Sequence, residues 1–478
     1  MSTFGPYEML LDFAFMSVLL FIAQFLRAKI KLIQNLYLPS SLLAGVAGLL
    51  LGPQFANVIP FTSQAGSYPY LLVVVLFATL FIGNSEKQSL KKVINDVGDT
   101  FTLNMAAEFG QFGIALLVGG FIMASLFPEV THVFSLLMPA GFVGGHGYAA
   151  AIGGTLEQML NWDEAVTIGQ TFATFGLLTG VFGGIVLINI AIRNGSTRLV
   201  KSMSQMPESM RTGLVPENER SVMGEDTINP MAMDPLSWHV LLVLIAVLGG
   251  YYASEFSAKI LPGITLPMMS LSMLAGVILQ FILNRTGFGK YVDKRIITRI
   301  GSSASDYLLA FGVATIKISV VIKYALPILV LCILGFTTCL FFVYGMGRKL
   351  FHNFWFERSI FIYGWTTGVV AIGVTLLRIV DPEFKSKTLE DYGMAYVFIS
   401  IVEVFIVSIT PVFISQGWSS VYIGGAVLTA IFLALMAITA IKYGINKQKV
   451  NELRVGEEEI IKQYMKEKSI KGDNVFTA

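Results

Sequence analysis

Charged residues and cysteines are scarce in this sequence. Asp, Glu, Lys and Arg make up 13% of the 478 residues, whereas 54% are hydrophobic and the mean hydropathy is +0.70. An average soluble domain is roughly 25% charged, so this composition excludes an ordinary globular enzyme and indicates a polytopic membrane protein. The net charge is only +2 and there is no basic stripe, so nothing points to a nucleic-acid partner.

The two cysteines, Cys332 and Cys339, lie in one apolar run. This pattern excludes a disulfide framework and a cysteine metal site, and it is typical of inert packing positions. A cleaved signal peptide is not expected either. The apolar run from Met9 to Phe25 follows Glu8, has no Lys or Arg before it, and has no small-residue cleavage site after it.

Long apolar stretches dominate the rest of the chain. About 20 apolar residues cross a bilayer as a helix, and on that rule the chain has about eleven spans. We expect them at Met9–Leu26, Leu36–Leu51, Pro69–Ile82, Phe101–Leu126, Ala165–Ile192, Ser237–Ala253, Ile264–Leu283, Tyr307–Ile322, Ala325–Tyr344, Tyr392–Ile414 and Tyr422–Ile441.

Basic residues between these spans indicate the orientation, because Lys and Arg stay on the cytoplasmic side. They cluster after alternate spans, and the loop Gly52–Ser67 has none. The pattern predicts an outside N-terminus and a cytoplasmic C-terminus, with 193–234 as a flexible cytoplasmic linker. The clusters are Arg27, Lys29 and Lys31; Lys87, Lys91 and Lys92; Arg193, Arg198 and Lys201; Lys290, Lys294, Arg295 and Arg299; Arg348 and Lys349; and Lys442, Lys447 and Lys449.

Two glycine-rich stretches interrupt the apolar pattern. Val143–Leu156 carries five glycines, one histidine and no charge, and Ile362–Leu376 is a diluted echo of it. Both contain Ala-Ile-Gly-x-Thr-Leu, starting at Ala151 and at Ala371. Such backbone is tolerated at membrane depth only where it is buried in protein or lines a wet cavity. We therefore predict re-entrant loops over about 139–156 and 358–378 that enter from opposite sides and meet near the middle of the membrane.

Weaker echoes follow the same order in both halves. Leu38-Pro39 leads into Leu-Ala-Gly-Val as Leu266-Pro267 does, and Tyr-Leu-Leu starts at Tyr70 and at Tyr307. With an odd number of spans per half, these echoes predict an inverted repeat, which is typical of secondary transporters. The predicted fold is an all-α polytopic membrane protein with two inverted five-helix repeats, each with a re-entrant loop. The expected parts are a first repeat 1–192, the linker 193–234, a second repeat 235–415, an additional C-terminal helix 416–444 and a charged cytoplasmic tail 445–478.

Gly144-Gly145-His146-Gly147, followed by three alanines, resembles the signature of the bacterial sodium/glutamate symporter family. Ala173–Leu177 and Leu377–Pro382 are similar to further motifs of that family. The resemblance implies sodium-coupled import of glutamate or a similar acidic amino acid across the bacterial inner membrane. It also implies a homodimer whose loop-bearing domain moves against a fixed scaffold. Tyr148 departs from the family pattern, because a small hydroxyl residue is usual there.

The loop residues are the expected substrate contacts. An unwound loop offers N–H groups to an anion, and glycine lets the ligand approach the backbone. His146 either donates to a substrate carboxylate or holds the loop to itself. Thr366 and Thr367 either bind substrate or sodium, or cap a helix. The glycines that we assign to binding, with close helix packing as the alternative, are Gly144, Gly145, Gly147, Gly364 and Gly368.

Arg378 is the candidate for binding the substrate's side-chain carboxylate. A guanidinium matches a carboxylate bidentately and keeps its charge in a pocket of low dielectric constant. Arg378 follows the second loop closely in the sequence. The alternatives are a cytoplasmic anchor and a partner for Asp381.

Charges inside spans need a reason, because each costs about 2.5–3.5 kcal/mol on insertion scales. Glu108 and Gln111 lie in the fourth expected span and Glu403 lies in the tenth. Oxygen ligands suit a small cation, so these three residues are candidates for a sodium site or for proton coupling. Otherwise the carboxylates form salt bridges, for example with Lys317. Na⁺ is expected as the coupling ion, and no cofactor is expected.

The leading prediction is a sodium-coupled symporter for a dicarboxylate amino acid such as glutamate. One alternative is a carrier or antiporter of other di- or tricarboxylates on the same fold. Another is a passive channel, because two half-membrane loops also build pores. An enzyme is not expected, since no metal-ligand spacing or nucleophile–base set occurs. No Gly-Lys-Ser/Thr follows the glycines, so a nucleotide-binding phosphate loop is not expected either.

Overall fold

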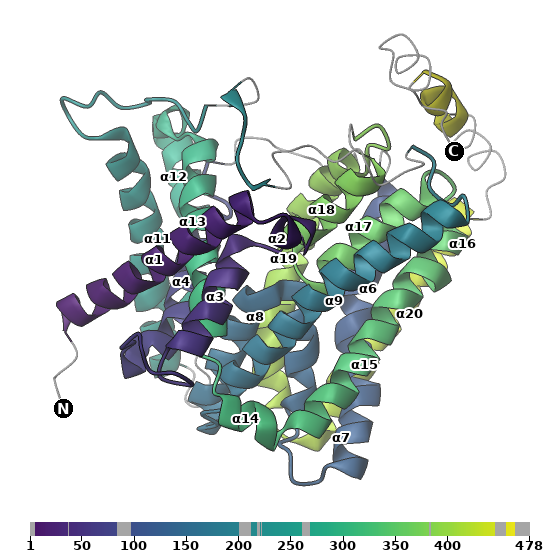
Figure 1. The fold of residues 1–478 in the computed structure, drawn as a ribbon, viewed down its shortest axis with the longest axis horizontal. Coiled ribbons are helices and arrows are strands. Elements are labelled where there is room, and N and C mark those ends of the chain that lie inside the picture. Colours follow the sequence, from purple (N-terminus) through teal and green to yellow (C-terminus); the bar gives the residue numbers. More distant parts are fainter. Residues whose placement is uncertain are drawn as a thin grey trace.

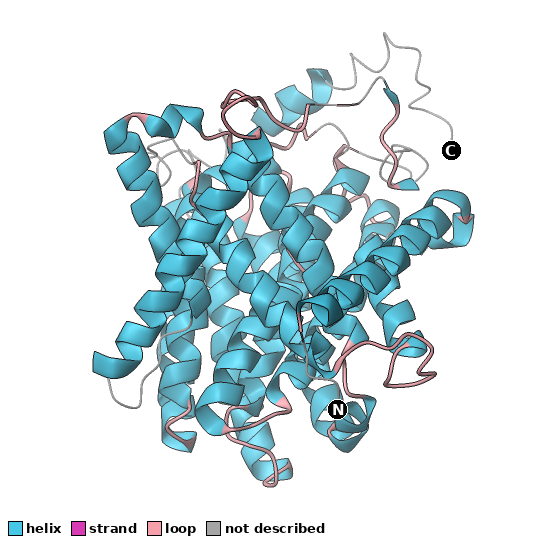
Figure 2. Ribbon diagram, turned by 90° about the vertical axis from the view of Figure 1, so that its left-hand side faces the viewer, coloured by secondary structure: helices cyan, strands magenta, loops and turns pink. Residues whose placement is uncertain are grey.

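The computed structural model describes residues 5–36, 38–83, 97–199, 212–217, 220, 222–260, 268–381, 384–444 and 456–463. Every regular element within these ranges is a helix, as Figures 1 and 2 show. Several sequence predictions fall outside them. These are the cluster Lys87, Lys91 and Lys92, the dipeptide Leu266-Pro267, Pro382 at the end of the last family motif, and most of the linker and tail.

The helices follow the chain in two halves. The first half consists of α1 (Pro6–Lys29), α2 (Lys31–Leu36), α3 (Ser40–Leu51), η1 (Ser63–Ser67), α4 (Tyr68–Thr79), α6 (Gly98–Ile114), η2 (Ala115–Gly119), α7 (Gly120–Leu126), η3 (Phe134–Leu136), α8 (Leu137–Leu160) and α9 (Ala165–Arg193). The second half consists of α11 (Pro235–Ile260), α12 (Met268–Thr286), η6 (Phe288–Tyr291), α13 (Lys294–Ala314), α14 (Ile318–Lys323), α15 (Ala325–Phe341), η7 (Phe342–Gly347), α16 (Arg348–Leu350), α17 (Trp355–Thr367), α18 (Val370–Val380), α19 (Thr388–Ile414), α20 (Trp418–Thr439) and η8 (Ala440–Gly444).

Six of the described helices are long and apolar enough to cross a membrane, or up to seven if the bent pair Thr388–Tyr396 and Phe398–Ile414 is one span. They make this chain an integral membrane protein. The prediction of about eleven spans also included short helices. α3 and α4 have 12 residues each, about 18 Å of helix, which is too short for a hydrocarbon core of about 30 Å.

One predicted boundary is wrong by a large margin. α13 begins at Lys294, well before the expected Tyr307. Asp293 caps its start, because the carboxylate accepts a hydrogen bond of 2.7 Å from the backbone N–H of Arg295. Lys294, Arg295 and Arg299, which we assigned to a loop, therefore lie in the first turns of this helix, whereas Lys290 lies before it in η6.

The helices form two bundles, which we call the side bundle and the main bundle (Figure 1). The side bundle contains α1, α3, α4 and α11–α13, with two small apolar cores of its own. The main bundle contains α6–α9 and α15–α20 around the largest apolar core, with Trp365 and Tyr363 among its most deeply buried side chains. α4 and α13 contact α8, so they form the boundary between the bundles.

Candidate functional site

α8 is a broken helix in the main bundle. Its backbone leaves helical geometry at Gly145 (φ 57°, ψ −150°), a region that only glycine adopts readily. One arm runs from Leu137 to Gly144 and the other from His146 to Leu160. The stretch predicted as a re-entrant loop over 139–156 therefore consists of two helical arms that meet at a single break, and its re-entry from one side of the membrane stays a prediction.

α17 and α18 form a second broken helix. α17 ends at Thr367, Gly368 leaves helical geometry (φ −140°, ψ −88°), and α18 starts after Val369, which is extended. The break again comprises one or two residues rather than a loop. The two breaks contact each other. A Cβ atom on Gly145 would lie 2.6 Å from Val369 Cγ1 and 2.9 Å from the carbonyl oxygen of Gly368.

The two broken helices approach from opposite ends of the main bundle. The two ends of the continuous helix Ala325–Leu350 show from which end of the main bundle each broken helix starts. Near its start, Lys323 Nζ and the Tyr324 hydroxyl donate to Glu164, in the turn between α8 and α9, at 2.8 and 2.5 Å. α17 begins just beyond its other end. In Figure 1, accordingly, α14 lies next to the lower end of α15 and α16 lies towards the upper right, beyond its other end.

The predicted binding glycines have different surroundings. Only Gly145 adopts positive φ among the glycines of the first stretch. Gly144 lies against the ring of Tyr148, and a Cβ atom on Gly147 would meet nothing closer than Val73 Cγ2 at 3.7 Å. Gly364 lies away from the break, where α17 packs closely against Gly373 of α18. Close packing therefore accounts for Gly364, and the break itself accounts for Gly145 and Gly368.

The polar residues next to the breaks are buried and bonded. His146 Nε2 lies 3.1 Å from the hydroxyl oxygen of Thr174 on α9, so it bonds to another helix rather than to its own loop. Thr366 and Thr367 donate to carbonyl oxygens of their own helix at 2.8 and 2.7 Å. These two hydroxyl oxygens keep lone pairs for a ligand, but their protons are already used.

Arg378 lies in the last turn of α18, far from the contact between the breaks. It lies nine positions after Val369, about 14 Å along the helix at 1.5 Å per residue. Its guanidinium carbon lies 5.1 Å from the ring centroid of Phe384, and its buried Nε has no hydrogen-bond partner within the described part of the chain. The structure thus separates Arg378 from the other predicted contacts, yet leaves it a donor for an anion.

Glu108 and Glu403 form a buried acidic pair. They lie on α6 and α19 and interact electrostatically. Tyr148 and Tyr396 donate to Glu403 Oε2 at 2.8 and 3.3 Å, whereas neither Glu108 oxygen has a hydrogen-bond partner among the described residues. Buried carboxylate oxygens without donors fit a small cation. No cluster of three or more His, Cys, Asp or Glu that could hold a metal occurs in the described ranges.

The assignment of Gln111 to a sodium site stays a prediction, and the pairing of these carboxylates with Lys317 is wrong. Gln111 lies beside Cys339 of α15, one turn beyond Glu108. Lys317 is not the partner of either carboxylate. Its Nζ instead donates to the backbone oxygen of Asp163 at 3.4 Å, because Lys317 follows the end of α13 and lies beside the α8–α9 turn.

We predict that Glu403→Gln raises the Na⁺ concentration for half-maximal uptake at least tenfold. The amide keeps an acceptor for Tyr148 but removes the charge that attracts a cation, and a charged interaction is worth about 1.5–3 kcal/mol. Initial uptake rates measured over a series of Na⁺ concentrations check this. Glu390→Gln, on the exposed face of the same helix, is the control. An unchanged Na⁺ dependence in Glu403→Gln would mean that Glu108 and Glu403 have a packing role and do not bind the cation.

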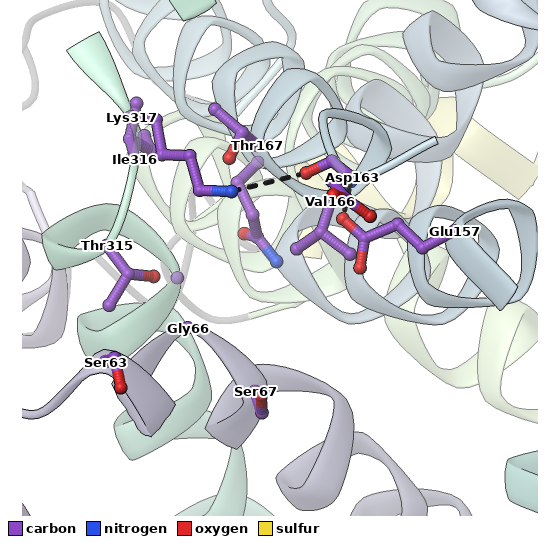
Figure 3. A pocket seen from close by; sticks show the side chains of 12 residues that line it. Ser63, Gly66, Ser67, Glu157, Asp163, Val166, Thr167, Thr315, Ile316 and Lys317 are labelled. Carbon is purple, nitrogen blue, oxygen red and sulfur yellow. Dashed lines mark hydrogen bonds between the residues drawn. The ribbon is translucent and has the colours of Figure 1, made fainter. Parts of the chain in front are cut away.

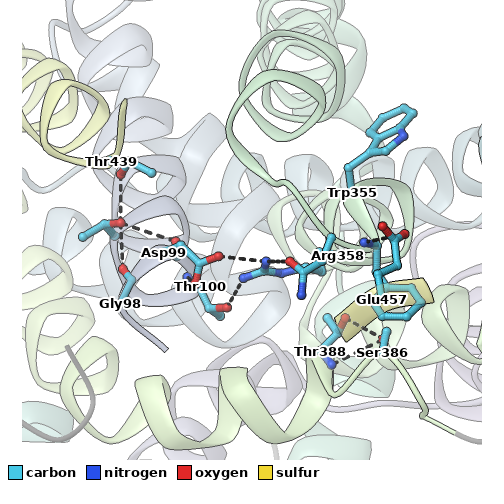
Figure 4. Close-up of polar contacts among 12 residues, drawn as sticks. Gly98, Asp99, Thr100, Trp355, Arg358, Ser386, Thr388, Thr439 and Glu457 are labelled. Atoms are coloured by element: carbon cyan, nitrogen blue, oxygen red, sulfur yellow. Dashed lines mark hydrogen bonds and ion pairs between the residues drawn. The ribbon is translucent and has the colours of Figure 1, made fainter. Parts of the chain in front are cut away.

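Arg358 is a buried charge that the sequence did not single out. It lies in the first turns of α17, is 3% exposed, and pairs with Asp99 of α6 at 2.8 Å. The nitrogen that pairs with Asp99, Nη1, also donates to Asn353 Oδ1 at 2.6 Å, and Nη2 donates to the hydroxyl oxygen of Thr100 at 2.5 Å. Figure 4 shows this group at one end of α6. The pair fixes the start of α17, which is the base of the second broken helix, to α6.

Two cavities lie at opposite ends of the antiparallel pair α4 and α13. The Lys294 ammonium group bonds to the end of α4, and Tyr68 at the start of α4 packs on Phe311 near the end of α13. One cavity, of about 270 Å³, lies at the Tyr68 end and touches α8 and α9. The other, of about 570 Å³, lies at the Lys294 end and includes Tyr396, a donor to Glu403.

Broken helices that meet tip to tip inside an integral membrane protein are typical of secondary transporters. The comparison with family models gives the particular family. The model of the sodium/glutamate symporter matches residues 7–354, so the chain belongs to that family and is a transporter by that membership. A comparison with curated proteins gave no match. The matched region stops just before α17, so the second broken helix, α19 and α20 lie outside it.

Proposed function

We propose that this protein is a Na⁺-coupled symporter that imports glutamate or a similar acidic amino acid across the bacterial inner membrane. The two broken helices are re-entrant hairpins, and substrate binds beside their tips. The main bundle moves past the side bundle in an elevator-type alternating-access cycle, as a homodimer with the N-terminus outside. The observation that carries the proposal is the contact of Gly145 with Gly368 and Val369. Broken helices that meet at mid-membrane supply N–H groups to anions and carbonyl oxygens to Na⁺.

Matching contacts in the two halves support the inverted repeat. A Cβ atom on Gly45 of α3 would lie 2.9 Å from a backbone oxygen of α13, and one on Gly276 of α12 would lie 2.9 Å from a backbone oxygen of α4. α3 and α12 carry the repeated Leu-Ala-Gly-Val, and each packs on a helix of the other half. Close approach of backbones at a small residue is typical of membrane helix pairs.

The contacts of the hairpin tips also join the two halves of the chain. Tyr148, after the first break, bonds to Glu403 of α19. Thr367, before the second break, packs on Gly180 of α9, where a Cβ atom would lie 2.7 Å from its hydroxyl oxygen. Each tip is thus held by the helix that follows the other hairpin, as expected of two opposed repeats.

The two cavities support alternating access. They lie at opposite ends of the α4–α13 pair. The smaller cavity has walls from both bundles, whereas the larger one is lined by α4 and α13 and, from the main bundle, by Tyr396. A sliding movement of the main bundle would widen one cavity and narrow the other.

Uptake into proteoliposomes tests the function. We expect labelled glutamate to accumulate only under an inward Na⁺ gradient, with no accumulation when choline replaces Na⁺. Exchange for an internal di- or tricarboxylate without Na⁺ would favour the antiporter alternative. Gradient-insensitive passive flux would favour the channel. Either result contradicts the proposed symport.

Arg378→Ala is expected to lower glutamate uptake at least tenfold without an equal loss of protein from the membrane. The variant removes the only guanidinium group of α18, and a lost bidentate charged pair is worth about 1.5–3 kcal/mol. Arg378→Lys keeps the charge and should recover part of the activity. Uptake divided by membrane abundance is the measurement. Parallel losses of uptake and abundance would indicate a structural anchor.

A further inference from the structure

The cavity of about 270 Å³ at the Tyr68 end of α4 has walls from both bundles. η1 and the residues after α13 form the side-bundle wall, and the end of α8 with the start of α9 forms the other. Figure 3 shows Glu157 and Asp163 close together on one side and Lys317 extending towards them from the other. Pockets for drug-sized molecules measure about 300–1,000 Å³, so this cavity suits only a small ligand.

Gln170 of α9 connects this cavity to the first hairpin tip. The side chain is 1% exposed and lines the cavity. Its Nε2 donates to the carbonyl oxygen of His146 at 3.1 Å, which fixes the orientation of the amide. The other amide atom, Oε1, has no hydrogen-bond partner in the part of the chain that the structure describes. A buried acceptor without a donor is unfavourable, and a ligand N–H would satisfy it.

The remaining polar groups around the cavity are suited to a zwitterion. Glu157 and Asp163 bring two negative charges, Lys317 brings one positive charge, and Thr167 adds a hydroxyl group. Glu157 Oε1 accepts from the backbone N–H of Val166 at 3.2 Å, which holds this carboxylate in place. An ammonium group needs acceptors, and a carboxylate needs donors. A bare metal cation would find the same oxygens but would be repelled by Lys317.

We propose that this cavity binds the head group of the transported amino acid, with Gln170 Oε1 and Glu157 as acceptors for its α-ammonium group and Lys317 as a donor to its α-carboxylate. This inference rests on the proposed function. It places the head group next to His146, whose carbonyl oxygen accepts from Gln170. The site therefore selects an amino acid over a dicarboxylate of the same length that lacks the ammonium group.

Competition between glutamate and glutarate tests this selection, because glutarate is glutamate without its ammonium group. In wild-type proteoliposomes under an inward Na⁺ gradient, glutarate should inhibit labelled glutamate uptake at least 100-fold more weakly than unlabelled glutamate does. Gln170→Leu should raise the KM for glutamate roughly 10- to 100-fold, the effect of one lost hydrogen bond to a charged group. The inhibition constant of glutarate and the Na⁺ dependence should stay within about twofold, since neither involves this hydrogen bond.

Two further variants separate recognition from structure. Glu157→Gln keeps the acceptor for the backbone N–H of Val166 but loses the charge. It should therefore lower the affinity for glutamate more than the affinity for glutarate. Asn189→Leu is the control. Its amide bonds within α9, to the carbonyl oxygen of Ile185 at 2.9 Å, away from the cavity. Both affinities should remain at the wild-type level in that variant.

The outcomes distinguish this inference from the proposed function. If wild-type vesicles do not accumulate glutamate with Na⁺, the proposed function fails and the site fails with it. If they do, but glutarate competes as well as glutamate, only the head-group site is overturned. Parallel losses of glutamate and glutarate affinity in Gln170→Leu and Glu157→Gln would likewise overturn it, since they would show a purely structural role.

Discussion

Gly145→Val is expected to reduce uptake by at least about 100-fold while the protein still reaches the membrane. Valine at φ 57° and ψ −150° is strained, at a cost of about 1–3 kcal/mol, which corresponds to roughly 5- to 150-fold in an equilibrium. Its side chain would also overlap Val369 Cγ1 and the carbonyl oxygen of Gly368. The substitution therefore forces the two breaks apart at the point where we propose that they cooperate. Uptake per membrane-inserted protein is the measurement.

Two glycine variants serve as comparisons. Gly393→Ala is the matched control, because a Cβ atom at that position of α19 would meet nothing within 4 Å. Gly147→Ala tests whether the whole glycine run or only its break matters. Residue 147 has helical backbone geometry, and a Cβ atom there would make only an ordinary contact with Val73. We expect both to keep most of the uptake. Wild-type uptake by Gly145→Val would remove the break from the mechanism.

The position of the first break could be predicted from the sequence only in part. A cluster of glycines between apolar segments indicates irregular backbone, and the break does lie within that cluster. Which glycine breaks the helix depends on what it packs against. Gly144 and Gly147 stay helical, while Gly145 alone has to accommodate the second tip. Sequence periodicity contains no information on that contact.

Side-chain contacts between helices that are distant in the sequence were the least predictable features. Glu108 and Glu403 are noticeable in the sequence because charge is rare in apolar spans. Their mutual proximity and the hydroxyl donors of Glu403 depend on the packing of α6, α8 and α19. Gln170 was missed because an uncharged amide inside an apolar span attracts no attention. Its significance comes from one unsatisfied oxygen, which only coordinates reveal.

The span count failed for a physical reason as well. Hydropathy measures apolar character, but α3 and α4 have only 12 residues each, so their apolar composition does not give them the length of a full span. The same ambiguity affects α13, whose basic first turns look like a loop in the sequence. A capping aspartate, Asp293, was the available signal for its true start.

Arg358→Met is expected to destabilise the protein by about 3–5 kcal/mol, the usual cost of removing one partner from a buried ion pair. The arginine side chain is 4% exposed and that of Asp99 16% exposed, so Asp99 would be left charged and largely shielded from water. Thr100 and Asn353 would lose their donor as well. Because this group holds the base of α17 to α6, the second hairpin should loosen first. Thermal unfolding of the purified protein in detergent is the measurement.

The double variant Asp99→Asn with Arg358→Met separates the charge from the packing. Removing both charges leaves no uncompensated ion, so the double variant should be more stable than Arg358→Met alone. Arg295→Met is the matched control, since its ion pair with Glu225 is 55% and 72% exposed and such surface pairs are worth about 0–1 kcal/mol. Equal losses in the single and double variants would place the stabilisation in the contact of the guanidinium group with Phe351, whose ring centroid lies 3.9 Å away. In that case α17 would be held by stacking rather than by charge, and the hairpin base would tolerate Asp99→Asn.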